Sequence, residues 1–508
     1  MMRRIVLGLS GALALAGCAV GPDYHAPKLV EPAKQPFLEG QNAALLSSQP
    51  LPARWWELFA DPVLDRLIAD AFAYNTDIAR AEANLRQARG VLSEQRAGLL
   101  PTTNTSAQYT HGRIGVQNTG VGGAGTVIGG GGGDGTNGPS GFNYDYYQVG
   151  FDASYELDVF GRVRRSIEAA RGDYQAQAAA LDGVRISVAA QVAQSYADAC
   201  GYAEQADVAR ETARLQSNTL SLTQRLLEAG RGTRRDVDQA AVTVERANAQ
   251  VPPLEASRRA EIYALAALTG RPPAELDQAA AACRAVPKIK TAIPIGDGAT
   301  LLARRPDVRQ AERTLAADTA RIGIATAALF PQINLLGSIG LGAPRVSDVG
   351  KSSSFSYSIG PLISWSFPNI AVARARIAQA RAGSDASLAG FQGTVLNALR
   401  ETESALARYT AALTENAALA RASAAASDAA ELSRLRFTTG RDSFLNLLVA
   451  EQDRAAARIA LAQSDTTVAE QAVSLFKALG GGWENAAPTV RAAPAAQSSL
   501  SQPQPSAH

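Results

Sequence analysis

The sequence is poor in the residues on which enzyme chemistry most often depends. Its 508 residues include three His, two Met and three Cys, and aromatic residues make up 6%. The histidines, His25, His111 and His508, lie far apart in the chain, so we expect no His-ligated metal centre, no buried His triad and no enzyme activity. The charge is balanced, with 49 Lys and Arg against 47 Asp and Glu. Such a chain is not typical of nucleic-acid-binding proteins.

Two short motifs resemble nucleotide-binding loops but lack the necessary context. Residues 120–125 fit the pattern GxGxxG, yet they lie in a glycine-rich tract that no helical pattern follows. Gly350-Lys351-Ser352 lacks the glycine five residues upstream that a P-loop requires. We therefore expect no bound nucleotide and no other cofactor.

After the N-terminal leader, no run of about 18 apolar residues offers a membrane-spanning helix. The leader itself has two Arg residues, an apolar run over residues 5–16 and small residues before Cys18. This is the pattern of a secretory signal. Leu15-Ala16-Gly17-Cys18 resembles the bacterial lipobox, in which cleavage before the Cys leaves a diacylated N-terminus. We predict that residues 1–17 are a lipoprotein signal peptide and that Cys18 is the lipid attachment site.

The chain contains two copies of one unit. Residues 77–101 align without gaps on residues 307–331, and Gly230-Arg231 aligns with Gly440-Arg441. The offset falls from 230 to 210 residues between these matches, so the first copy carries 20 extra residues. A glycine-rich tract at 119–141 lies in that interval. We predict that it is a loop, because Gly maximises chain entropy and offers no side chain to pack.

Within each copy the pattern changes from helical to alternating. Ala- and Arg-rich runs at 61–100 and 300–330 predict helices that stop at a Pro. The residues that follow alternate as β-strands do and carry many of the aromatic side chains, although a soluble sheet buried on one face would alternate in the same way. We expect two β-hairpins with strands at 102–110, 143–157, 332–341 and 352–366.

Two long helices follow the hairpins. Residues 172–230 contain no Pro, and a continuous helix over them would be about 87 Å long. Residues 383–440 repeat the pattern. Helices of this length are stable only when they pack lengthwise on others. Each is expected to turn at a Gly-Arg pair, after which an Ala-rich helix returns toward Gly270 or Gly480. Four strands cannot close a barrel, whereas three chains would supply about 12.

Several motifs carry a resemblance to a known family. They are Ala19-Val-Gly-Pro-Asp-Tyr24-His-Ala-Pro27, Trp55-Trp56-Glu-Leu-Phe59-Ala-Asp61-Pro62-Val-Leu64, Arg304-Arg305-Pro306-Asp307-Val308 and Phe330-Pro331. The chain up to Trp483 resembles the NodT- and OprM-like outer-membrane efflux lipoproteins of the TolC superfamily. This implies a mixed α and β membrane protein: a homotrimeric channel with a 12-stranded β-barrel, four strands per chain, continued by a long α-helical barrel in the periplasm and surrounded by an equatorial girdle.

The expected domains follow from the repeats and the resemblance. They are the signal peptide at 1–17; an N-terminal arm at 18–60; a first repeat at 61–270, with a β-hairpin at 101–158 and a helical hairpin at 159–270; an equatorial linker at 271–299; a second repeat at 300–483, with a β-hairpin at 331–366 and a helical hairpin at 367–480; and a tail at 484–508 whose Ala, Pro, Gln and Ser content is typical of disorder.

The resemblance implies a lipid-anchored channel in the outer membrane that extends into the periplasm. It would passively conduct small solutes or drugs delivered by a periplasmic adaptor (membrane fusion) protein and an inner-membrane pump of the RND type. Two alternatives stay open. One is the outer-membrane conduit of a type I protein secretion system, and the other is a lipid-anchored coiled-coil scaffold without a pore. The sequence does not name the solute, because specificity would lie in the pump.

Two sets of residues are predicted to act away from the membrane. Cys200 and Cys283 are estimated to lie in the girdle zone, where they could form a disulfide in the oxidising periplasm, or be two unrelated buried thiols. The two Gly-Arg turns are the clearest breaks in the long helices and lie farthest from the barrel. Their residues are the predicted adaptor contact: Gly230, Arg231, Gly232, Thr233, Gly440, Arg441, Asp442 and Ser443.

A gate is predicted just inside these turns. Residues 440–451 resemble the family's gate segment, in which a Leu and, four residues later, an Asp face the lumen. Leu445 keeps the Leu, whereas Val449 replaces the acid. We expect an apolar plug, with Asp236 on the other return helix assigned to the same gate. Strong pH-dependent cation selectivity would instead move the gate to an acid such as Asp236, Asp238 or Glu451.

Overall fold

The computed structural model describes residues 19–28, 35–41, 46–47, 49, 51–115, 141–275, 277–365 and 370–482. Cys18, the signal peptide, most of the glycine-rich tract and the predicted tail lie outside these residues. The chain divides into two compact units. The strand unit comprises Met1–His25, Arg89–Asp173 and Ala316–Ala386, and the helical unit comprises Ala26–Ala88, Tyr174–Leu315 and Ser387–His508.

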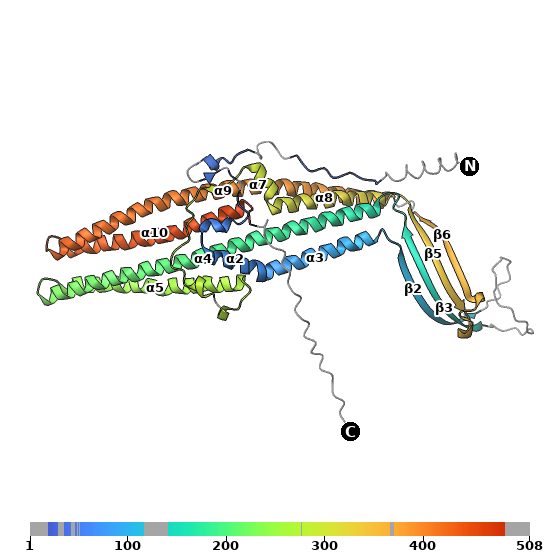
Figure 1. Cartoon of the computed structure of the whole chain (residues 1–508), viewed down its shortest axis with the longest axis horizontal. Helices are drawn as coiled ribbons and strands as arrows, with labels where there is room; N and C mark the ends of the chain where they lie inside the picture. The colour runs from blue at the N-terminus through green and yellow to red at the C-terminus, as the bar shows by residue number, and fades with distance from the viewer. Residues whose placement is uncertain are drawn as a thin grey trace, which may run out of the picture. The chain divides into compact units, whose positions relative to one another are not determined.

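The strand unit contains a four-stranded antiparallel sheet in the order β2-β3-β5-β6 (Figure 1). Its strands are β2 (Thr102–Gly115), β3 (Gly141–Glu156), β5 (Gln332–Ala343) and β6 (Phe355–Ser364). The strands of the first hairpin extend farther toward its loop than predicted, since β2 runs to Gly115 and β3 begins at Gly141. The start of the last strand was predicted wrongly: Ser352–Ser354 form the 3-10 turn η7, preceded by η6 (Val346–Asp348), and pairing begins at Phe355.

The two faces of the sheet differ in chemistry. In β6 the odd-numbered side chains are large and apolar except for Pro361, and Tyr357 and Ile359 are 72% and 76% exposed in the single chain. The register places Ile339 of β5 opposite Tyr357 and opposite Phe151 of β3, so the apolar face continues across the strands. The other face of β6 is mostly small and polar, with Ser356, Ser358, Gly360 and Ser364, and Leu362 is its one large apolar side chain.

The long helices are longer than predicted. α4 covers Arg162–Glu228, 67 residues, and α9 covers Ile370–Thr438, 69 residues. Both therefore begin before Gly172 and Gly383, which the sequence analysis took as their starting points. Among the described helices, none has both the length and the apolar composition needed to cross a membrane.

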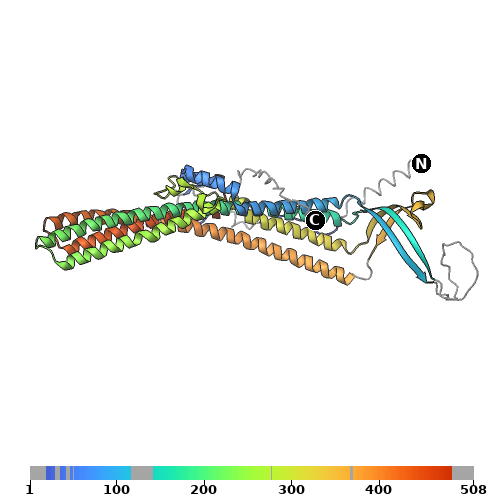
Figure 2. The ribbon, with the colours of Figure 1, turned by 90° about the horizontal axis from the view of Figure 1, so that it is seen from below.

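The return helices of the helical unit are α5 (Arg234–Leu268) and α10 (Phe444–Ala478). The hairpins α4–α5 and α9–α10 run alongside each other to their turns in both views (Figures 1 and 2). Near the turns, Ala240 of α5 packs in one cluster with Phe444 and Leu448 of α10. Phe437, at the end of α9, packs against that cluster. The two hairpins therefore pack directly on each other near their turns.

Each helical run before a hairpin is broken once, which the sequence analysis missed. The first divides into α2 (Pro62–Tyr74) and α3 (Thr76–Ala97), and the second into α7 (Gly298–Arg304) and α8 (Pro306–Ala327). At each break, a side chain contacts the end of a return helix. Asn75 Nδ2 donates to the carbonyl of Leu268 at 2.9 Å, and Arg305 Nη1 donates to that of Ala478 at 2.8 Å. The end of α5 therefore lies next to the start of α3, and the end of α10 lies next to the start of α8.

A girdle core lies where the N-terminal arm, the linker and the end of α10 meet. Trp55 is fully buried, and its ring stacks on Phe476 with centroids 4.7 Å apart. The arm pairs with the linker through a short parallel ladder. The remaining elements are η3 (Glu39–Gln41), β1 (Leu46–Ser47), η4 (Trp55–Phe59), η5 (Pro273–Glu275), α6 (Gln278–Ala281) and β4 (Ile293–Pro294).

Candidate functional site

The first tip, residues 229–233, is a tight turn closed by backbone hydrogen bonds. Gly230 has φ +70°, a left-handed conformation that favours glycine. The Arg231 N–H donates to the carbonyl of Leu226 at 2.8 Å. Thr233 then begins α5 with a capping box, in which Asp236 N–H donates to Thr233 Oγ1 and Thr233 N–H donates to Asp236 Oδ2.

The second tip, residues 439–443, repeats this geometry. Gly440 also has φ +70°, and the Arg441 N–H donates to the carbonyl of Arg436 at 2.8 Å. Ser443 caps α10 by accepting from Asn446 N–H at 3.2 Å. Asp442 accepts from the Asn446 side chain at 2.6 Å and from Ser443 N–H at 2.9 Å, and these bonds hold the pKa of its carboxyl below the usual range. The guanidinium groups of Arg231 and Arg441 have no ion pair in the described part of the chain.

The predicted gate side chains lie on α10 directly after the second tip. Leu445 is 61% exposed and Val449 is 48% exposed, whereas their neighbours Leu447 and Leu448 are buried in the hairpin. The capping box engages the carboxylate of Asp236. Of the three predicted gate residues, Leu445 and Val449 are exposed, whereas the Asp236 carboxylate accepts hydrogen bonds in the cap of α5.

Asp453 belongs to the same face of α10, and the sequence analysis missed it. Asn446, Val449 and Asp453 together line a groove of about 300 Å³ beside Ala426 and Ala429 of α9. Leu445, Val449 and Asp453 are spaced four residues apart, which places them one above another on a helix. Asp453 therefore places a carboxylate one turn beyond Val449, and its spacing of four residues from Val449 was the signal that could have found it.

Glu451, a fallback gate residue, is buried inside the second hairpin. Its side chain is 1% exposed and forms ion pairs with Arg434 of α9 and Arg454 of α10. A carboxylate enclosed by two guanidinium groups in this way is not available to line a lumen. Glu451 instead holds the second hairpin together, a role that no sequence motif indicated.

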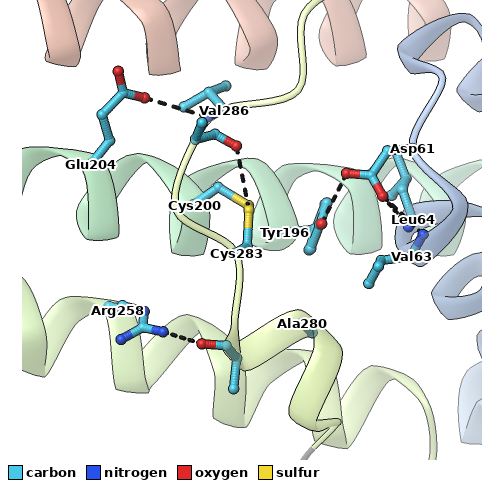
Figure 3. Close-up of a disulfide and its surroundings, with 12 residues drawn as sticks. Asp61, Val63, Leu64, Tyr196, Cys200, Glu204, Arg258, Ala280, Cys283 and Val286 are labelled. Carbon is cyan, nitrogen blue, oxygen red and sulfur yellow. Dashed lines mark hydrogen bonds between the residues drawn. A yellow bond between two sulfur atoms is a disulfide. The ribbon is translucent and has the colours of Figure 1, made fainter.

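The structure joins Cys200 of α4 to Cys283 of the linker in a disulfide, with Cα atoms 5.2 Å apart (Figure 3). The linker is held on both sides of this bond. Arg258 of α5 donates to the carbonyl of Ala281, and Val286 N–H donates to Glu204 of α4 at 3.3 Å. Burial raises the pKa of the Glu204 carboxyl. The disulfide therefore ties the linker to the helical hairpin at the level of the girdle.

Comparison with solved structures identifies the fold. The channel OprN matches with a TM-score of 0.83 and 33% identity, over 92% of this chain and all of that one. The open-state MtrE channel of Neisseria gonorrhoeae matches with a TM-score of 0.78 and 30% identity, over 92% of this chain and 99% of that one. The predicted TolC-like channel fold is confirmed, with one four-stranded sheet per chain.

Sequence comparison agrees over nearly the whole chain. Residues 67–271 and 299–481 match the family described as outer membrane efflux protein. Nodulation protein T of Rhizobium leguminosarum bv. viciae is 29% identical, with 94% of this chain and 93% of that protein covered. OprJ of Pseudomonas aeruginosa is 29% identical, with 95% and 97% covered. The chain belongs to the outer membrane efflux protein family, and it is a non-enzymatic channel component of an efflux pump in the outer membrane.

Proposed function

We propose that three copies of this chain form a passive conduit, filled from the periplasm by an adaptor and an inner-membrane pump. The observation that carries the proposal is the exposed apolar face of the sheet opposite a polar face. Strands whose apolar side chains face outward and whose small or polar side chains face inward are those of a lipid-embedded barrel. β2 and β6 are the outer strands of the four, so each has a free edge for a neighbouring copy.

The residues after Cys18 support a lipid anchor beside the sheet. Arg165, at the start of α4, donates to the carbonyl of Val20 at 3.3 Å and to Asp23 at 2.7 Å. Gly21 packs against Gly323 so closely that a Cβ would overlap its backbone. An acyl chain on Cys18 would then enter the membrane near the ends of the strands. Intact-mass analysis of membrane-extracted protein should show acylation and loss of residues 1–17.

Leu445 and Val449 are proposed to close the channel just inside the tips. Three copies would bring three exposed Leu and three exposed Val side chains toward one axis. A narrow apolar ring blocks ions by excluding water and presents no charge to titrate. The carboxylates of Asp453 would form a separate ring about 6 Å farther along the helix.

The two tips are proposed as the adaptor contact. Residues 229–233 and 439–443 expose backbone groups and the guanidinium groups of Arg231 and Arg441, which offer directional hydrogen bonds to a partner. An Arg231→Ala/Arg441→Ala variant keeps both glycine turns. Arg54→Ala/Arg345→Ala is the control, since it removes two exposed arginines elsewhere.

The cargo is proposed to be small organic solutes. SrpC and TtgC of Pseudomonas putida are named for solvent and toluene efflux pumps, and they are 30% and 29% identical to this chain. An RND-type pump is the proposed partner. The pore-free scaffold alternative is wrong, because the relatives are efflux channels and the chain carries their sheet. The named relatives favour solute efflux over type I protein secretion.

The test is efflux in a strain from which the gene has been deleted, combined with bilayer recordings of the purified protein. We expect the unmodified chain to restore solute resistance and the control variant to match it. The double tip variant should fail, although its trimer and membrane level are normal. Val449→Asp should add a cation preference that acid removes. Full resistance with the double tip variant would refute the tip assignment, and strong acid-sensitive cation selectivity that persists in an Asp453→Asn variant would refute the apolar gate.

A further inference from the structure

A polar recess of about 820 Å³ lies in the helical unit where α3, α4, α8, α9 and α10 meet. Serine and glutamine side chains form part of its wall, among them Ser187, Gln191, Ser404 and Ser474. Its volume is within the range of sites that hold a small organic molecule. Five of its lining residues are basic and three are acidic: Arg80, Arg305, Arg400, Arg408 and Lys477 against Asp77, Asp307 and Glu401.

The three acids of the recess already have cation partners. Asp77 pairs with Arg80 at 3.0 Å. Asp307 and Glu401 both pair with the buried Arg305, at 2.7 and 2.9 Å. The ammonium of Lys477 and the guanidinium of Arg408 have no ion pair within the described residues, and both side chains are exposed. The recess therefore has an uncompensated positive charge, although the whole chain is close to neutral.

The floor of the recess includes Val188, Ala405 and Ala478 of the girdle core, whereas its serine side chains point away from that core. Val192 of α4, Leu406 of α9 and Phe476 of α10 belong to that core. At 100° per residue, Ser187, Ser404 and Ser474 point roughly half a turn away from these side chains on the same helices. A girdle surrounds the outside of a helical tube. The recess therefore faces the lumen of the channel.

We propose that this recess is a transit site for anionic solutes, which Arg408 and Lys477 attract through carboxylate, phosphate or sulfonate groups. The proposal rests on the channel function. Three copies would place six such cations around one level of the tunnel. Fixed charge in a confined, partly apolar passage raises the local concentration of the opposite ion. Gln191, Gln310 and Gln471 supply neutral hydrogen-bond donors at the same place.

Acidic residues lie next to the recess and could oppose its positive charge, so anion binding has to be measured directly. Asp198 of α4 is partly buried, and the carboxylates of Glu470 of α10 and Glu261 of α5 are near enough to raise its pKa. By helical spacing, Asp198 shares the face of Ser187, and Glu470 that of Ser474. If these acidic residues dominated the lumen, small anions would be repelled rather than bound.

The first measurement is binding of a fluorescent anion, pyrenetetrasulfonate, to detergent-solubilised full-length protein. We expect saturable binding that weakens with salt, and an Arg408→Gln/Lys477→Gln variant that binds about five- to tenfold more weakly. The matched control is Arg284→Gln/Lys290→Gln, which removes the same charge from the linker. Absence of binding, equal binding by all three proteins, or an equal loss in the control would each overturn the proposal.

The second measurement is the reversal potential of reconstituted channels in a salt gradient. The Arg408→Gln/Lys477→Gln variant should shift toward cation preference, and the linker control should not. An unshifted potential would overturn a role in conduction. Unmodified protein that conducts no ions would count against the channel function itself, and the binding measurement separates that failure from failure of the recess.

Discussion

The two helical hairpins share a turn but differ in what holds them and in what they expose. Both tips have a glycine at φ +70° and a capped return helix. In the first hairpin, Thr243 donates a hydrogen bond to Gln216 at 3.2 Å. In the second hairpin, the buried Glu451 forms ion pairs with two arginines. The positions equivalent to Leu445 and Val449 are Arg235 and Gln239. The two copies share the backbone turn, but the side chains exposed next to it are polar in the first hairpin and apolar in the second.

The largest expected effect is on the buried charge of the second hairpin. Glu451→Ala leaves Arg434 and Arg454 without their partner, and breaking a buried ion pair from one side costs about 3–5 kcal/mol. The matching change in the first hairpin, Thr243→Ala, removes a neutral hydrogen bond and should cost about 1 kcal/mol. Hydrogen exchange of α9 and α10 near the second tip should accelerate strongly in Glu451→Ala. Exchange in α4 and α5 should change only slightly in Thr243→Ala.

A control separates the charge from the packing. Glu451→Gln keeps the size of the side chain and loses the charge, so it should resemble Glu451→Ala if the ion pairs dominate. Equal acceleration of exchange in both hairpins for Glu451→Ala and Thr243→Ala would contradict the comparison, because the two hairpins would then be held with equal strength.

The disulfide gives the first repeat a covalent tie that the second lacks. The residue equivalent to Cys200 is Thr410, which donates to the carbonyl of Leu406 within its own helix. Cys200 and Cys283 are 83 residues apart, and a cross-link closing a loop of that size contributes about 2–4 kcal/mol. We expect Cys283→Ser to lower the melting temperature and to speed exchange in the linker and α5.

Reductant provides the control for this effect. It should lower the melting temperature of the unmodified protein and leave that of Cys283→Ser unchanged. Complete labelling of both cysteines by an alkylating reagent before reduction would show that the bond does not form in the periplasm.

A pH dependence is expected from Asp198, whose counterpart in the second repeat is Arg408. Burial and the neighbouring carboxylates of Glu470 and Glu261 raise the pKa of the Asp198 carboxyl from 3.8 to about 8. A carboxyl with a raised pKa in the folded state favours folding while it is protonated there. Its contribution is therefore complete below about pH 4 and is lost as the pH rises toward 8.

Melting temperatures from about pH 5 to about pH 9 measure this contribution. The unmodified protein should lose stability over the range, and Asp198→Asn should flatten the curve and melt higher at the alkaline end. Asp453→Asn, which removes an exposed carboxyl from α10, is the control and should leave the slope unchanged. A slope that persists in Asp198→Asn would assign it to other groups.

The fold was largely predictable from local patterns, because they repeat. Alternation marked the strands, and the Gly-Arg pairs marked both tips. The breaks at Asn75 and Arg305 escaped notice, since each follows from a contact with a helix end about 170 to 190 residues away. Pro306 was the one local signal of a break.

The side-chain partners were less predictable than the backbone. Arg434 and Glu451 lie on opposite sides of the second tip, so only the folded hairpin brings them together. Cys200 and Cys283 could be placed at similar heights from helix lengths, but helix lengths do not fix the separation of two Cα atoms. The polar recess is likewise formed by five helices together, and the sequence shows the faces of those helices only separately.

The smallest expected effect concerns the caps, where the two hairpins are most alike. Thr233 and Ser443 each accept a backbone hydrogen bond at the start of a return helix, and replacing such a residue by Ala costs about 1 kcal/mol. Thr233→Ala should cost more than Ser443→Ala, because it also breaks the reciprocal bonds to Asp236, whereas Asp442 still binds Asn446 after the second change. Hydrogen exchange confined to the first turn of α5 or α10 measures the difference. Equal acceleration at the two tips would mean that the capping box adds nothing to the single cap, and the turns would then be equivalent in strength as well as in geometry.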